Sequence, residues 1–377
     1  MKVSSYWILS IFSLSICLLP LGDATADSIR IESFAEERLN EILETRECFS
    51  CQIEGLEVSG VDFSNTLLER IQISSSIILD SNLSEVNLAR SLVRHTDLSG
   101  SNLSGSNLTD SEFRHVTLNR VDMHDANFQS ARIGATSFEE TDLIGSSFIG
   151  AYLEAVSFRE NDLSLVNFNN ATLNRVNFIG ADLQETNLDQ VSFQDVIYSP
   201  TTIFPEGFSI PDTGIYLLAP YSSAIGLQSY GNDFSRLDLT GMDFSGSRMR
   251  ADFSRAILSQ AIFNSATLIF SKFNNANLHN ASFCSTNLGG TDLSNADLRD
   301  SILSLAVLES ANLSNAQLQG ADIRGSDLSQ AIIESSDFEG AVYDENTAFP
   351  EEFNPEAAGA ILSDEVILDC PSVEGQI

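Results

Sequence analysis

Four aspartates recur at one constant interval, a spacing that would matter in a chain that returned to the same place after each interval. They are Asp122, Asp142, Asp162 and Asp182. Asn82 and Asn102 occupy earlier positions of the same series, and His124 lies beside its start. Ligand sets made only of oxygen atoms favour calcium or magnesium. The series therefore predicts either a divalent-cation site or a column of solvated side chains.

Cationic residues repeat at the same interval earlier in the chain. The repeated residues are Arg94, His95, Arg114 and His115, with Arg90 and Arg120 close by. The chain as a whole has 53 acidic and 19 basic residues, a formal net charge of -34. A basic cluster on so acidic a molecule predicts a docking site for an acidic partner, a headgroup or an anion. The alternative interpretation is an ordinary solvated surface.

The sequence contains no recognisable catalytic constellation. It has no glycine-rich phosphate loop after a strand, and no nucleophile, histidine and acid on converging segments. We therefore expect no enzyme, and no cofactor apart from calcium or magnesium at the aspartates. The acidic composition excludes a basic nucleic-acid binder. A content of 43% apolar residues, with 24 phenylalanines, predicts a packed fold rather than a disordered chain.

A period of five runs through most of the chain, and four periods make up the interval between the aspartates. Every fifth position is apolar over residues 53–198, and again over residues 234–249 and 253–343, with one residue lost between them. The residue two positions earlier is small or β-branched, except at Leu56, Ile71 and Asn161 in the first series. Neither an α-helix nor an alternating strand has this period. The backbone must turn a corner in every unit of five, and four corners close a square.

Segments such as Ala181–Glu185 (ADLQE) and Ala296–Asp300 (ADLRD) resemble the A-(D/N)-L-x-x unit of pentapeptide repeat proteins. The resemblance covers residues 53–198 and 233–343. It implies an all-β fold of two right-handed quadrilateral β-helices, with four units per coil and the large and small residue of each unit inside. Residues four units apart would then lie above one another at the strand spacing of about 4.8 Å.

The expected domain boundaries follow the prolines. All prolines after residue 26 lie outside the repeats, because proline cannot donate to a β-ladder. Residues 198–208 and 343–353 share a pattern of Tyr, Thr, Phe, Pro and Phe. We expect an N-terminal capping helix and C-x-x-C leader at residues 27–52, β-helices at 53–198 and 233–343, a cap and linker at 199–232, and a C-terminal Pro-containing cap and tail at 344–377.

The capping helix is expected over residues 33–45, at the open end of the first β-helix. Ser33 and Glu36 have capping-box spacing. The apolar residues of this segment form one helical stripe, Phe34, Ala35, Leu39, Ile42 and Leu43.

Residues 1–26 resemble a secretory signal peptide. Lys2 precedes an apolar run over residues 7–19, and Ala24-Thr25-Ala26 forms an A-x-A cleavage site. The run is short for a membrane span and Pro20 follows it; a retained anchor is the alternative. We expect export to a periplasm, a thylakoid-type lumen or the extracellular space, with no integral membrane span after cleavage.

Four cysteines remain after cleavage: Cys48, Cys51, Cys284 and Cys370. The C-x-x-C before the first repeat resembles the leader of many secreted members of the family, which implies a Cys48–Cys51 disulfide in an exported protein. Reduced thiols that fill the core are the alternative. Cys284 follows Phe283 at an expected outward corner. A thioredoxin-like site and a zinc site are not expected.

Three functions fit these patterns. The first is a secreted, non-enzymatic scaffold or interaction module with an unidentified protein partner, either a monomer or an end-to-end dimer. The second follows from resemblance to family members that inhibit DNA gyrase, and is an acidic rod-shaped DNA mimic acting on a topoisomerase. The signal peptide argues against it, because gyrase is cytosolic. The third is a divalent-cation-binding surface protein built on the aspartates.

Overall fold

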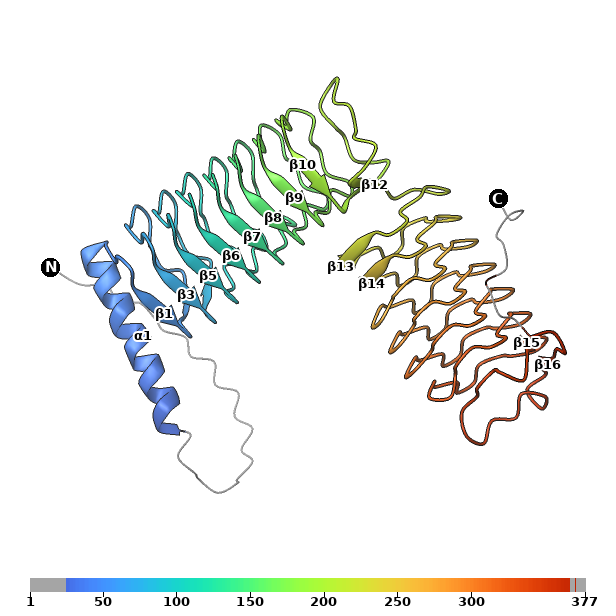
Figure 1. The fold of residues 1–377 in the computed structure, drawn as a ribbon. Coiled ribbons are helices and arrows are strands. Elements are labelled where there is room, and N and C mark those ends of the chain that lie inside the picture. The colour runs from blue at the N-terminus through green and yellow to red at the C-terminus, as the bar shows by residue number, and fades with distance from the viewer. Residues whose placement is uncertain (1–24, 367–369, 371–377) are drawn as a thin grey trace.

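The structure, a computed structural model, describes residues 25–366 and Cys370, with side chains from residue 35 onward. The expected signal peptide, except for its last two residues, lies outside this range. The described chain begins with a helix, α1 (Thr25–Thr45), and continues as a β-solenoid (Figure 1).

The solenoid is made of short parallel strands joined by corners. Eight of the strands form one parallel sheet in the order β1-β3-β5-β6-β7-β8-β9-β10. Each strand of this sheet pairs with the strand that follows four units later, so that Leu153 pairs with Leu173. The strands are β1 (Gln52–Glu54), β2 (Glu57–Ser59), β3 (Gln72–Ser74), β4 (Ile77–Leu79), β5 (Leu92–Arg94), β6 (Glu112–Arg114), β7 (Arg132–Gly134), β8 (Tyr152–Glu154), β9 (Thr172–Asn174), β10 (Ser192–Gln194), β11 (Val196–Tyr198), β12 (Ile215–Leu217), β13 (Gln228–Asp233), β14 (Arg248–Asp252), β15 (Val342–Tyr343) and β16 (Ile361–Leu362).

The corners explain the period of five. The second residue after each large apolar residue commonly has a positive φ, as at Asp110 (58°) and Asn170 (57°). Asn and Asp tolerate this left-handed conformation better than other residues with side chains do. The residue before the large one is often Asn or Asp, and its side-chain oxygen accepts a backbone hydrogen bond across the corner, as in Ser84 N–H to Asn82 Oδ1 (3.2 Å).

Phenylalanines fill the middle of the solenoid in two stacked columns. Phe128 stacks on Phe148 with ring centroids 4.7 Å apart, and Phe138 stacks on Phe158 at 5.1 Å. Members of different columns meet edge to face, as Phe128 and Phe138 do at 6.2 Å. Residues two units apart lie half a coil apart, so the alternation of Phe and Leu in the sequence produces large-on-large columns. These rings are fully buried and make up much of the apolar core.

The buried apolar residues form two clusters, one over residues 35–215 and one over residues 179–360. We call the coils of residues 47–217 the first run and those of residues 219–363 the second run; a bend separates them (Figure 1). Ile179 and Ile197 lie at outward positions of the first run, yet both are buried in the second cluster. The two runs therefore pack against each other at the bend.

The second run begins earlier than the sequence boundary at residue 233 indicates. Ser223 already pairs with Asp243, and Ala224 and Leu227 are fully buried. The residue lost between 249 and 253 is absorbed in β14, where the pairing interval with β13 shortens between Gln228–Arg248 and Asp233–Asp252. A coil can lose a corner residue because the inward side chains before and after it keep their places.

Helix α1 packs across the first coil, as its apolar stripe predicts. Ala35 and Ile42 are buried in the first cluster, and Leu39 and Leu43 pack against it. The predicted start at Ser33 is wrong, because the helix extends back to Thr25 and Ser33 lies within it. A capping box cannot operate inside a helix, where the backbone N–H groups already have carbonyl partners.

The two segments that share a sequence pattern also fold alike. The Thr202 hydroxyl accepts a hydrogen bond from Ser199 N–H and donates to the Phe178 carbonyl oxygen, at 3.0 and 2.7 Å. The Thr347 hydroxyl does the same with Asp344 N–H (3.0 Å) and the Ile323 carbonyl oxygen (3.2 Å). The sequence duplication is therefore also a structural one.

Candidate functional site

Each aspartate of the evenly spaced series holds a corner of the solenoid. Its Oδ1 accepts a hydrogen bond from the backbone N–H two residues later, over 2.8–3.2 Å. Asn82 and Asn102 accept the same bond at 3.2 and 2.8 Å. The local structure therefore requires an acceptor at these positions, and an amide satisfies the requirement as well as a carboxylate does.

The aspartate series is divided into two pairs by Asn161. In regular coils the Thr141 carbonyl oxygen would accept the backbone N–H of residue 162, as the Val121 carbonyl oxygen accepts that of Asp142. The Asn161 side chain takes this place and donates from Nδ2 to the Thr141 oxygen at 2.9 Å. Among the described coils, β-bridges join Asp122–Asp142 and Asp162–Asp182, and none joins Asp142–Asp162.

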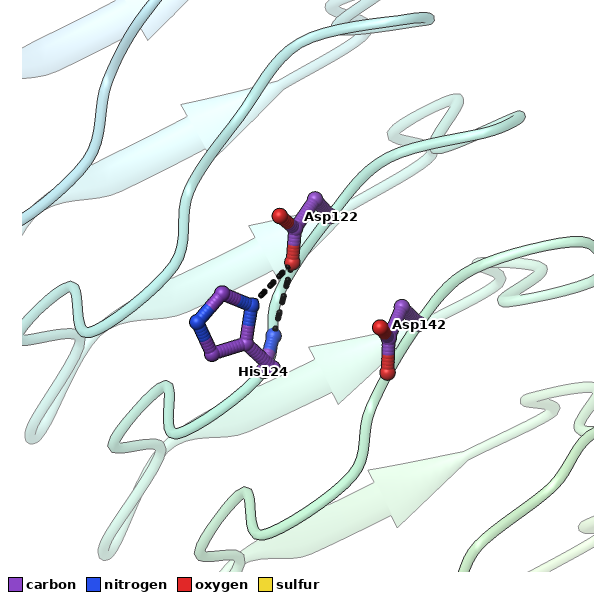
Figure 2. A group of neighbouring side chains, drawn as sticks. All are labelled: Asp122, His124 and Asp142. Carbon is purple, nitrogen blue, oxygen red and sulfur yellow. Dashed lines mark hydrogen bonds and ion pairs between the residues drawn. The ribbon is translucent and has the colours of Figure 1, made fainter.

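Asp122, His124 and Asp142 form a cluster that could hold a metal ion (Figure 2). One ligand atom from each lies within 4.8 Å of the other two. His124 Nδ1 is 2.6 Å from Asp122 Oδ1, and this hydrogen bond raises the pKa of His124. The two carboxylates suit calcium or magnesium, whereas the imidazole suits transition metals. Asp162 and Asp182 do not belong to the cluster.

The four predicted cationic residues lie together on the outer face of the large sheet. Arg94 and Arg114 are register partners in β5 and β6. Both contact the same Glu112 oxygen, from Arg94 Nη2 at 2.7 Å and from Arg114 Nε at 2.9 Å. The rings of His95 and His115 stack, with centroids 4.9 Å apart and planes 9° from parallel. We call these four residues the basic patch.

The basic patch continues into a surface cavity that sequence reasoning missed. The cavity has a volume of about 200 Å³ and lies beside Arg114 and His115. Its other lining residues come from the next coils and include Arg132, Gly134, Tyr152, Glu154 and Arg175. Small residues at 134, 135 and 155, in the columns that continue from Arg114 and His115, were a signal that could have revealed it.

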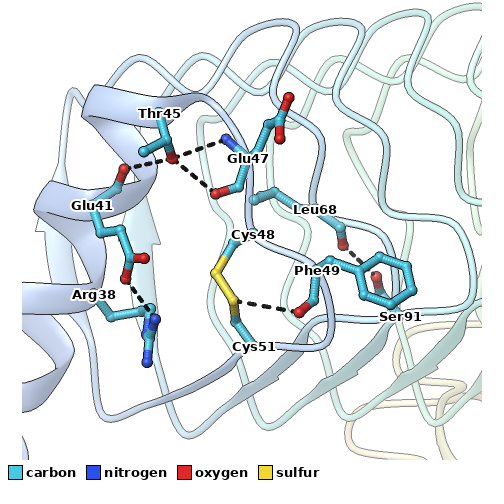
Figure 3. The surroundings of a disulfide bond; sticks show 9 residues. All are labelled: Arg38, Glu41, Thr45, Glu47, Cys48, Phe49, Cys51, Leu68 and Ser91. Carbon is cyan, nitrogen blue, oxygen red and sulfur yellow. Dashed lines mark hydrogen bonds and ion pairs between the residues drawn. A yellow bond between two sulfur atoms is a disulfide. The ribbon is translucent and has the colours of Figure 1, made fainter.

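Two disulfides are present among the described residues. One joins Cys48 to Cys51 between α1 and the first coil (Figure 3). The other joins Cys284 to Cys370, with Cα atoms 5.6 Å apart. The expectation that Cys284 lies at an exposed corner is wrong, because its side chain is fully buried. The disulfide brings residue 370 onto a coil 86 residues earlier, a contact that the period of five does not encode.

Comparison with known proteins places the repeats in a family. The model "Pentapeptide repeats (8 copies)" matches residues 81–120, 261–300 and 301–340, and the model "Pentapeptide repeat region" matches residues 119–188. A pentapeptide repeat protein from Nostoc PCC 7120 is 32% identical, over 30% of this chain and 86% of that one (TM-score 0.26). This chain belongs to the pentapeptide repeat family.

Other pentapeptide repeat proteins of known structure are similar in sequence over different spans. HetL from Nostoc sp. strain PCC 7120, involved in heterocyst differentiation regulation, is 21% identical over 82% of this chain and 96% of its own, with a TM-score of 0.20. A protein from the Arabidopsis thaliana thylakoid lumen is 38% identical over 29% of this chain and 68% of its own, with a TM-score of 0.13. No curated protein matches the chain. No helix in the described part of this pentapeptide repeat protein is long and apolar enough to cross a membrane.

Proposed function

We propose that this pentapeptide repeat protein is an exported, non-enzymatic scaffold that binds an acidic protein partner through the basic patch. The observation that carries the proposal is the register stacking of Arg94 on Arg114 and of His95 on His115 in a chain with a net charge of -34. Glu112 is shared by both arginines and neutralises only one of them. The patch therefore keeps a positive charge that long-range repulsion would otherwise make unfavourable to concentrate.

Export is supported by the cysteines as well as by the leader sequence. Disulfides persist in oxidising compartments and are rare in the cytosol. All four cysteines outside the proposed signal peptide take part in disulfides. We propose that Cys48 and Cys51 form the leader of a secreted type of pentapeptide repeat protein, destined for a periplasm, a thylakoid-type lumen or the extracellular space.

We also propose that the two runs are two β-helices, each ended by its own Pro-containing cap. The matched hydrogen bonds of Thr202 and Thr347 support this arrangement. The proline-containing segments also carry Phe204, Phe208, Phe349 and Phe353, which pack against the cores of the preceding coils.

The basic patch can be tested by partner capture from the exported fraction. The double variant Arg94→Gln, Arg114→Gln is compared with the parent and with Arg255→Asn, which removes an exposed charge from the second run. Hydrogen bonds to charged groups are strong enough that losing two should weaken capture about tenfold or more. A partner that the parent and the control retain but the double variant loses supports the proposal. Equal capture by all three proteins contradicts it.

The DNA-mimic hypothesis keeps one supporting feature, an acidic solenoid with a charge of -34. Fractionation separates it from the scaffold proposal. We expect the chain in the exported fraction, beginning at Asp27, and expect no inhibition of gyrase supercoiling. Full-length protein in the cytosol that inhibits gyrase would favour mimicry instead.

We propose in addition that Asp122 and Asp142 bind a divalent cation. The approach of their carboxylates to within 4.8 Å supports this, because two unneutralised carboxylates repel each other at that distance. Asp162 and Asp182, joined by their own β-bridge, would form a second and separate pair.

A further inference from the structure

The cavity beside the basic patch exists because three consecutive corner positions lack long side chains. In the columns that carry Arg114 and His115, the following residues are Gly134, Ala135, Glu154 and Ala155. A Cβ atom at Gly134 would lie 3.8 Å from both Arg114 Cγ and the Glu154 carbonyl oxygen. The space above residue 134 is therefore open, and it is bounded by longer side chains on both sides.

Three guanidinium groups surround this cavity and two carboxylates lie beside them. Arg114 is held by Glu112, and Arg175 is paired with Glu154. Among the described residues, Arg132 makes no hydrogen bond or ion pair through its guanidinium group. Together these five groups carry one net positive charge at neutral pH. Placing that charge in an open cavity leaves room for one monoanionic group.

Hydrogen-bond donors at the cavity are also left without acceptors. Nε of Arg175 is buried and has no partner in the structure. The Tyr152 hydroxyl accepts a hydrogen bond from Asn174 Nδ2 at 3.3 Å, which leaves its own proton to donate. Arg132 adds a planar set of donors that matches the two oxygens of a carboxylate. The donors come from β7, β8 and the corner after β9, so the sheet fixes their spacing.

We propose that this cavity binds a side-chain carboxylate from an extended acidic segment of the protein partner. The inference rests on the proposed function and adds the chemical group recognised and the residues that hold it. Arg132 and Arg175 would hold the carboxylate oxygens above Gly134, with Tyr152 donating from one side. The basic patch would then attract the flanking acidic residues from neighbouring coils.

A path for the rest of such a segment leads from the cavity across the bend. The Arg175 guanidinium lies over the Tyr230 ring, 5.6 Å from its centroid. Tyr230 is the register partner of Arg250, whose guanidinium lies 5.6 Å from the centroid of the exposed Phe270 ring. Cationic and aromatic side chains thus alternate from the first run onto the second, and β13 and β14 lie close to the end of the large sheet (Figure 1).

The test is binding of a fluorescein-labelled octaglutamate peptide to the full chain, measured by anisotropy at low ionic strength. Three variants are compared with the parent. Arg132→Gln removes the unpaired guanidinium, and Gly134→Leu fills the cavity without changing any charge. Arg255→Asn removes one exposed positive charge from the second run and is the matched control. Arg132 is exposed and Gly134 has no positive φ, so we expect all of them to fold.

We expect Arg132→Gln and Gly134→Leu each to weaken peptide binding about tenfold, and Arg255→Asn to leave it within about twofold. Peptide binding that Gly134→Leu leaves unchanged overturns the cavity inference. If Arg94→Gln with Arg114→Gln abolishes that binding, the proposed function survives without the cavity. Inorganic phosphate that binds the parent while the peptide does not would overturn the assignment to a peptide carboxylate.

Discussion

Arg159 and Asp233 join the two runs of coils across 74 residues of sequence. Nη1 of Arg159 donates to the Asp233 backbone carbonyl oxygen at 2.6 Å and lies 3.5 Å from the Asp233 carboxylate. The Arg159 side chain is only 18% exposed. Together with Arg175 over Tyr230 and with the buried Ile179 and Ile197, this contact holds the bend at one angle.

Replacing Arg159 with methionine should loosen the bend without unfolding either run. Methionine keeps the apolar length of the side chain but removes the hydrogen bond, which costs about 1.5–3 kcal/mol when the donor is charged and shielded. Small-angle X-ray scattering should then show a broader distribution of distances, and proteases should cut faster within residues 199–218. Arg248→Met, an exposed arginine of the second run, is the control. A scattering curve identical to that of the parent would show that the apolar contacts alone set the angle.

Replacing Leu153 with arginine should destabilise the first run strongly. Leu153 is the central residue of β8, fully buried between Ile133 and Leu173. Burying an unpaired charge there should cost more than about 3 kcal/mol of unfolding free energy. Gln129→Arg, at an exposed corner, adds the same charge outside and should change the midpoint of thermal unfolding little. Equal melting curves for the two variants would contradict the register.

His124 should titrate above the usual histidine range because it donates to Asp122, which raises its pKa. The folded state then keeps its proton to a higher pH than the unfolded chain does. The stabilisation is complete below the unfolded pKa and disappears as the pH rises through the folded pKa. NMR titration of the parent and of Asp122→Asn should show a lower His124 pKa in the variant, with His279 as an internal reference. An unchanged His124 pKa would remove Asp122 as the cause.

Calcium should raise the melting temperature of the parent, whereas potassium at equal ionic strength should not. The double variant Asp122→Asn, Asp142→Asn should abolish the shift, because asparagine keeps the corner hydrogen bond and removes both charges. Asp162→Asn with Asp182→Asn is the matched control and should retain most of the shift. A shift that the first double variant retains, or that the parent never shows, would exclude a cation site at Asp122 and Asp142.

Much of this fold is determined by the sequence by itself. The period of five requires a corner after every unit, and each corner needs an inward large residue, a small one and an acceptor such as Asp182. The alternation of Phe and Leu dictates which rings stack, so the Phe128–Phe148 column follows from the spacing alone. The vertical neighbours Arg94 and Arg114 were also predictable, because residues four units apart share one column. These features are local or depend on a fixed interval, which is why one sequence is sufficient to predict them.

Only the tertiary structure decided the features that depart from the interval. The Asn161 side chain competes with a backbone N–H for the Thr141 carbonyl oxygen, and that competition divides the aspartate series. Cys284 is buried because residue 370 reaches back to it, and Arg159 meets Asp233 because the runs bend. The cavity above Gly134 depends on how the longer side chains around it pair with Glu112 and Glu154. In each case a side chain chooses between partners distant in sequence, and that choice is settled by packing in three dimensions.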